Sequence, residues 1–106
     1  MAVSVYSLTK SFPKDELFGM TSQIRRAVES IPANIAEGWA RRTPKKFQHF
    51  LRMSSGSLRE LETHLILSER VGICSKEAIQ SMLNEATILG KQILTLYRNL
   101  SGKNNC

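Results

Sequence analysis

The chain carries, at positions 30 to 38, the stretch Ser30-Ile31-Pro32-Ala33-Asn34-Ile35-Ala36-Glu37-Gly38. Apolar and small residues around it recur in the steps typical of one side of a helix: Ile24, Ala27, Ile31, Ile35 and Gly38. We therefore predict a helix from about Thr21 to Ala40. A proline inside a helix removes a donor and clashes with the carbonyl four residues back, here that of Val28, at a cost of about 3 kcal/mol. Neighbouring groups must offset that cost.

A polar strip runs along the same predicted helix, beside the apolar stripe. Its members are Gln23, Arg26, Ser30, Asn34, Glu37 and Arg41. Ser30 and Asn34 are placed to bond backbone groups that the proline frees. We interpret the strip as a structural network in which Arg26 pairs with Glu37 and reaches Ser57 or Glu60 of the next helix. Ligand binding by the same residues is the alternative.

Two long helices are predicted after this segment. Thr43 followed by Pro44 is a cap and first-turn pair, and it opens a helix of about 28 residues that ends at Gly72. Ser75 then caps a last helix, beyond which residues 101–106 are expected to fray. Both helices keep apolar residues at alternating steps of three and four, and the link between them is short. They should therefore lie antiparallel.

A short helix precedes these segments, from Val3 to Lys10, and ends before Pro13. No Asn-Gly or Asp-Gly hairpin signal is present, and 106 residues suit a single domain spanning residues 1–106. The sequence thus predicts an all-α, antiparallel up-and-down four-helix bundle with a shortened first helix.

The net charge of +6 is concentrated in one segment. Between positions 41 and 59 there are six basic residues and no acidic one: Arg41, Arg42, Lys45, Lys46, Arg52 and Arg59. Lys45, Arg52 and Arg59 are seven positions apart and span roughly 21 Å of helix. Such a ladder suits phosphate backbones, so we predict a nucleic-acid-binding surface here. The alternative is a solvated helix face, to which a pair between Arg59 and Glu62 would belong.

Catalytic and metal-binding constellations are not recognisable. His49 and His64 would lie about 22 Å apart along one helix, so they cannot share a metal. Glu37, Glu60 and Glu62 lack the Glu-x-x-His spacing of a di-metal bundle site. No catalytic residue, metal or cofactor is therefore expected, and the chain is predicted not to be an enzyme.

The two cysteines, Cys74 and Cys106, are isolated thiols that suit a reducing cytoplasm. No apolar run is long enough to cross a bilayer. Met1 to Thr9 contains neither a basic start nor a continuous apolar core, so no signal peptide is expected. We predict a cytoplasmic protein without a membrane partner.

The proline-containing stretch is preceded by Gln23-Ile24-Arg25-Arg26-Ala27 and followed by Gly56-Ser57-Leu58-Arg59-Glu60-Leu61-Glu62. Together these segments closely resemble the four-helix-bundle family named for proteins encoded in intervening sequences of bacterial large-subunit ribosomal RNA genes. Carried over by position, the family signature comprises Gln23, Arg26, Ala27, Ser30, Ile31, Pro32, Asn34, Ile35, Ala36, Glu37, Gly38, Arg41, Gly56, Ser57 and Glu60.

The resemblance implies a small antiparallel bundle that forms homo-oligomeric rings, typically pentamers, without enzymatic activity. A sister branch, the accessory proteins of diversity-generating retroelements, forms basic pentamers that bind nucleic acid and a reverse transcriptase. Family members usually begin with a longer first helix, so exposed leucines here would need a partner subunit. We expect an oligomer associated with RNA or DNA through its basic helix face; the alternative is a protein-partner scaffold.

Overall fold

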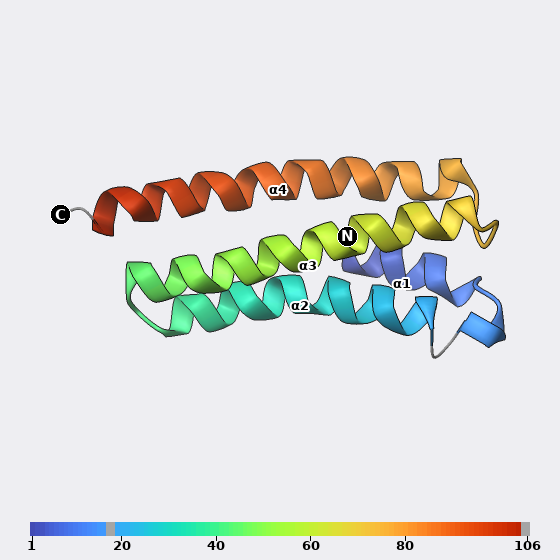
Figure 1. The fold of residues 1–106 in the computed structure, drawn as a ribbon, viewed down its shortest axis with the longest axis horizontal. Helices are drawn as coiled ribbons and strands as arrows, with labels where there is room; N and C mark the ends of the chain where they lie inside the picture. The colour runs from blue at the N-terminus through green and yellow to red at the C-terminus, as the bar shows by residue number, and fades with distance from the viewer. Residues whose placement is uncertain (17–18, 105–106) are drawn as a thin grey trace.

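Four α-helices make up the molecule in the computed structural model, which describes residues 1–16 and 19–104. They are α1 (Ala2–Lys10), α2 (Met20–Ala40), α3 (Pro44–Arg70) and α4 (Lys76–Asn104), with a short 3-10 turn, η1 (Lys14–Glu16), between the first two. The described residues contain no strand. Figure 1 shows α2, α3 and α4 running antiparallel along a rod 51 Å long. The predicted all-α bundle with a shortened first helix is confirmed.

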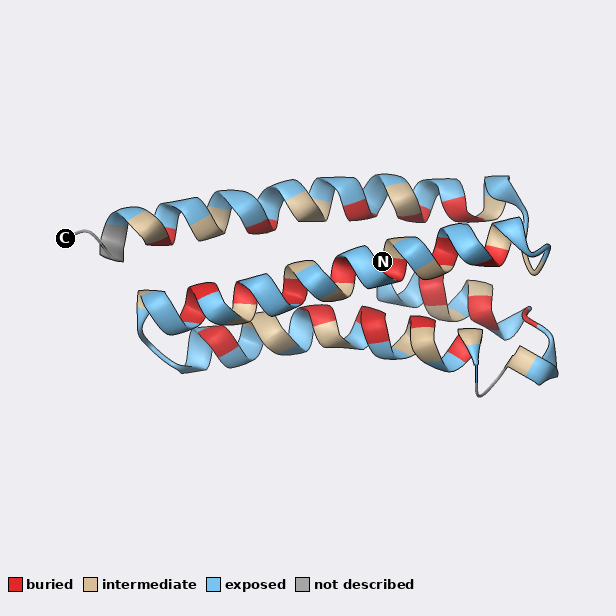
Figure 2. Cartoon of the chain, viewed as in Figure 1, coloured by how far each residue is buried: buried red, intermediate tan, exposed pale blue. Residues whose placement is uncertain are grey.

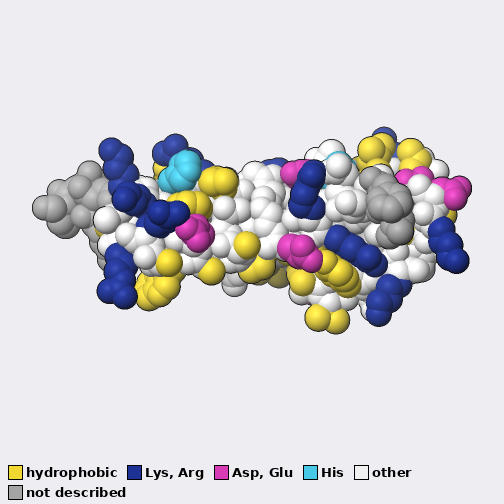
Figure 3. Space-filling view, turned by 90° about the horizontal axis from the view of Figure 1, so that it is seen from below, with side chains coloured by type: hydrophobic (Ala, Val, Ile, Leu, Met, Phe, Trp, Pro, Cys, Tyr) yellow, Lys and Arg dark blue, Asp and Glu magenta, His cyan; other side chains and the backbone are white. Residues whose placement is uncertain are grey.

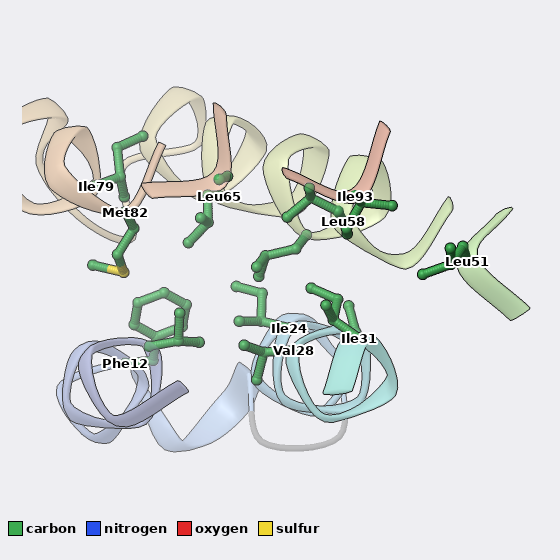
Figure 4. Close-up of a cluster of buried hydrophobic side chains, with 14 of the residues drawn as sticks. Phe12, Ile24, Val28, Ile31, Leu51, Leu58, Leu65, Ile79, Met82 and Ile93 are labelled. Atoms are coloured by element: carbon green, nitrogen blue, oxygen red, sulfur yellow. The ribbon is translucent and has the colours of Figure 1, made fainter. Parts of the chain in front are cut away.

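The apolar core follows the faces that the helices turn toward one another (Figure 2). Ile24, Val28 and Ile31 of α2 are buried opposite leucines of α3, among them Leu58 and Leu65 (Figure 4). The buried residues of α2 belong to the apolar side predicted for that helix. Those of α3 are at the alternating steps of three and four read from the sequence. Burial of both sets supplies the main stabilisation of the bundle.

Small and hydroxylated residues bring α2 and α3 close together. A Cβ atom added at Gly38 would lie only 2.9 Å from both Phe47 Cδ1 and Phe50 Cβ. Farther along the contact between α2 and α3, which we name the seam, the hydroxyl of the fully buried Ser54 donates a 2.7 Å hydrogen bond to the carbonyl of Ile31. The end of α2 is therefore pressed directly onto the start of α3.

The helix α2 is continuous through Pro32. The Pro32 ring is exposed, so it displaces no side chain of the core. The carbonyl of Val28 has no donor at position 32, and Val28 itself is only 1% exposed. The proline therefore costs the helix one backbone hydrogen bond.

The predicted helix boundaries have the expected chemistry. Thr43 Oγ1 accepts a hydrogen bond from the Lys46 N–H at 3.3 Å, and Ser75 Oγ accepts one from the Ala78 N–H at 3.1 Å. After α3, Gly72 has a φ of 83°, and the N–H of the next residue, Ile73, returns 2.9 Å to the Ser68 carbonyl. This last arrangement is a Schellman motif, which reverses the chain toward α4.

The first helix covers only part of the groove between α2 and α4. It is nine residues long, about 13 Å, and bridges α2 and α4 at one end of the rod, while α3 separates them along its length. Met82 of α4 lies beneath this cover beside Phe12 and is buried (Figure 4). Leu89 and Leu96 lie seven and fourteen positions farther along α4, beyond the cover, and are only half-buried.

The helix α4 extends into the segment for which the sequence predicts fraying. It continues through residues 101–104. Ser101 supplies the reason, because its hydroxyl lies 2.7 Å from the donating amide of Gln48 on α3 and 3.4 Å from the Tyr97 carbonyl. Residues 105 and 106, with Cys106 among them, lie outside the described part of the chain.

Replacing Pro32 with Ala should stabilise the protein. The substitution restores a donor to the Val28 carbonyl, partly offset by the freer unfolded chain, so the free energy of unfolding should rise by about 1–2 kcal/mol. Thermal unfolding at fixed protein concentration measures this as a higher Tm. The control Ala36→Gly, at an exposed site on the same helix, should lower the free energy by about 1 kcal/mol. An unchanged or lower Tm for Pro32→Ala would show that the proline costs nothing here.

Candidate nucleic-acid interface

At the end of the rod where α2 passes into α3, Lys and Arg side chains lie with few acidic ones among them, whereas both signs of charge mix toward the other end (Figure 3). Within residues 34–56 and 90–102, the described chain holds seven exposed basic residues and one carboxylate, that of Glu37. The basic residues, which we name the basic end, are Arg41, Arg42, Lys45, Lys46, Arg52, Lys91 and Arg98. The remaining eight acidic residues of the chain lie outside these segments, so the rest of the rod is nearly balanced in charge.

Two members of the basic end, Lys91 and Arg98, come from α4 and were absent from the sequence-based surface. The antiparallel packing of α4 on α3 brings them there. The contact is direct, because the Gln48 amide donates to the Tyr97 carbonyl at 3.0 Å. The sequence signal was available, since no acidic residue follows Glu85, but it became meaningful only once α4 was paired with α3.

The predicted cations differ in whether another side chain of the protein already pairs with them. Arg41 lies 2.5 Å from Glu37, and Arg59 lies 2.7 Å from Glu62, so both are largely neutralised. Arg52 donates to the hydroxyl of Tyr97 at 2.6 and 3.0 Å, which holds the guanidinium in place but leaves its charge. Within the predicted ladder, Arg59 has a carboxylate partner, whereas Lys45 and Arg52 have none among the described residues.

Of the six cations predicted from the sequence, Arg42, Lys45 and Lys46 have no side-chain partner among the described residues, and the same holds for Lys91 and Arg98 of α4. Lys45 and Arg52 also line an open cavity of about 520 Å³ with Gln48 and His49. An open, cationic surface of this kind suits phosphate oxygens better than an enclosed apolar ligand.

The predicted polar network is present between α2 and α3 at its centre. The hydroxyls of Ser30 and Ser57 share a hydrogen bond of 2.7 Å across the two helices. The Asn34 amide donates to both the carbonyl and the hydroxyl of Ser30 at 2.9 Å. Asn34 thus bonds the backbone near Pro32, but at Ser30 and not, as predicted, at the Val28 carbonyl that the proline leaves without a donor. The group is half-buried and fixes how α2 sits on α3.

The predicted pair between Arg26 and Glu37 is wrong. The two residues lie eleven positions apart on one helix, which is about 16 Å along its axis. Arg26 instead contacts Gln23 and lies 3.6 Å from Glu60 of α3, while Glu37 pairs with Arg41. All of these charged side chains are exposed, so they add little to stability.

Other chemistry is sparse in residues 1–16 and 19–104. No three metal-ligating side chains gather there, and His64 lies 3.5 Å from Glu60 as a local pair. Burial raises the pKa of the free Cys74 thiol, with a smaller contribution from Glu69, which keeps the thiol in its less reactive protonated form. None of the described helices combines the length and apolar content required to cross a membrane.

The family model of the 23S rRNA-intervening sequence protein matches residues 1–95. The chain belongs to this family. The match takes in α1, α2, α3 and most of α4, so it confirms the resemblance carried by the proline-containing stretch. A search of the curated proteins found no match.

Asn34 and Glu37 should contribute unequally to stability. Asn34→Ala removes two hydrogen bonds to Ser30 and should lower the free energy of unfolding by about 1–2 kcal/mol. Glu37→Gln weakens only an exposed pair and should change it by less than about 0.5 kcal/mol. Urea denaturation of the two variants against the parent checks this. Equal effects would mean that the polar strip acts as one charged network after all.

Proposed function

We propose that this member of the 23S rRNA-intervening sequence protein family is a non-enzymatic, nucleic-acid-associated protein that binds RNA through its basic end. The observation that carries the proposal is the set of three unpartnered, exposed cations, Arg42, Lys45 and Lys46. Unpaired cations beside one another repel, which lowers stability slightly unless a polyanion is bound. Such a cost is understandable if the surface serves binding.

The expected mode of binding is electrostatic. Each phosphate that a Lys or Arg neutralises releases condensed counterions, so affinity falls steeply as salt rises. Contacts of this kind fix the position of a strand but carry no sequence information. We therefore propose binding to the sugar-phosphate backbone without strong sequence preference, in the cytoplasm.

A protein-partner scaffold remains the competing function. It would use the half-buried leucines of α4, Leu89 and Leu96, as a docking surface, with nucleic-acid binding incidental. The two functions differ in salt dependence, because an apolar contact is nearly insensitive to moderate salt whereas phosphate binding is not.

Neutralising the unpartnered cations should weaken RNA binding. The triple variant Arg42→Gln, Lys45→Gln, Lys46→Gln is expected to flatten the slope of log affinity against log salt by roughly two, at about 0.7 per lost single-strand phosphate contact. Fluorescence anisotropy with a labelled ribosomal RNA fragment over a salt series measures both the affinity and the slope.

The matched control changes the same net charge at the other end of the rod. Lys10, Lys14 and Lys76 are exposed and belong to the balanced half, so their replacement by Gln should leave the slope nearly unchanged. If both triple variants lose affinity equally, net charge and not the basic end governs binding. Absence of any binding at low salt would refute the proposal.

We further propose that the chain forms homo-oligomers, with a pentamer as the ring size that the family resemblance favours. Ile35 of α2 and Leu89 and Leu96 of α4 remain half-buried where the short α1 no longer reaches. Ile88, which is exposed, adjoins Leu89 and extends this apolar surface of α4. A second copy would bury this surface and place several basic ends on one RNA, which raises affinity by multivalency.

Polar substitutions on the uncovered α4 face should dissociate the oligomer. Leu89→Ser with Leu96→Ser is expected to shift the mass measured by light scattering at micromolar concentration toward one chain, while circular dichroism still reports helix. The control pair, Ile66→Ser with Leu67→Ser, changes exposed apolar residues of α3 and should leave the mass unchanged. A parent protein that is already monomeric would contradict self-association.

A further inference from the structure

Trp39 is the most unusual side chain at the basic end. It is the single tryptophan of the chain, and 74% of it is exposed. A tryptophan side chain has a large apolar surface, and burying it would stabilise the fold. An exposed tryptophan gives up this stabilisation. Trp39 stands two positions before Arg41, the last member of the polar strip, and three before Arg42. The exposure of Trp39 therefore calls for an explanation outside the packing of the bundle.

The position of the indole is set by the seam beneath it. Gly38, the preceding residue, is buried where α2 presses onto Phe47 and Phe50. The Trp39 ring then meets the Phe47 ring at a centroid distance of 6.0 Å and an interplanar angle of 75°. Two rings nearly at right angles cover at most one face of either partner, so at least one indole face is clear of Phe47.

A cation lies near the indole. Trp39 and Arg42 line the same cavity of about 240 Å³, together with Phe47, Pro44 and Leu100. Arg42 has a φ of 61°, a left-handed conformation that ends α2 in a tight turn, and its guanidinium has no partner among the described residues. An exposed aromatic ring and an unpaired cation thus line one small cavity.

We propose that Trp39 is a stacking platform for an unpaired base of single-stranded nucleic acid, whose adjoining phosphate is held by Arg42. This inference rests on the proposed function and narrows it from backbone binding in general to unpaired strands. Bases in a duplex are already stacked on one another and present no free face, whereas single strands offer both a face and a phosphate. Stacking needs no hydrogen-bond pattern, so it remains independent of sequence.

The emission of Trp39 tests the proposal directly in the unmodified protein. A single-stranded RNA of about 12 nucleotides should quench it on binding, whereas the same RNA annealed to its complement should bind through the cations without quenching. Trp39→Leu should weaken single-strand affinity on the order of tenfold, as loss of one stacked base does, and leave the salt slope unchanged. Arg42→Gln should reduce that slope, and Trp39→Phe should retain part of the affinity.

The outcomes separate this inference from the proposed function. Salt-dependent RNA binding without quenching, and with full affinity in Trp39→Leu and Trp39→Phe, would overturn base stacking and leave backbone binding intact. If fluorescence anisotropy showed no RNA binding at all, both base stacking by Trp39 and the proposed function would be refuted. Emission that shifts to the blue as protein concentration rises, without RNA, would place Trp39 in a contact between copies and would also overturn the inference.

Discussion

The close contact between α2 and α3 is the constraint on which the rest of the molecule depends. Gly38 leaves no room for a side chain against Phe47 and Phe50, and Ser54 bonds the α2 backbone at Ile31 from across the seam. Ser30 and Ser57 add a third polar contact. Small residues let two backbones approach, and buried hydroxyls fix their register because a shift would strand them without partners. The loop that follows α2 inherits its position from this seam.

The charge of the basic end arises from the topology of the bundle more than from any local motif. The segment around the α2–α3 loop is basic on its own, but α4 adds Lys91 and Arg98 only because Gly72 turns the chain back along α3. The cations then differ in whether a carboxylate of the same chain pairs with them. Carboxylates one turn away neutralise Arg41 and Arg59, while Arg42, Lys45 and Lys46 keep their charge for a partner.

Periodicity and caps predicted most of the fold, because the spacing of apolar residues and the chemistry of Thr43, Ser75 and Gly72 are local signals. The polar strip also predicted that α2 contacts Ser57 or Glu60, but it assigned both contacts to Arg26, whereas Ser57 bonds Ser30 and only Glu60 lies near Arg26. Two residues on one face of a helix need not touch, however. The predicted pair between Arg26 and Glu37 does not form because the two residues lie too far apart along the axis of α2. The α4 cations, the bond from Ser54 and the extension of α4 to Asn104 depend on tertiary packing, which a single sequence does not reveal.

The uneven distribution of charge along a rod 51 Å long has a consequence for how the molecule meets a polyanion. At physiological ionic strength the Debye length is about 8 Å, so the balanced end lies several screening lengths from a strand that the basic end touches. Attraction therefore acts on one end alone and exerts a torque as well as a pull. Under the proposed function, the protein would approach a strand end first, and lowering the salt concentration would improve its alignment in the encounter as well as its rate of arrival.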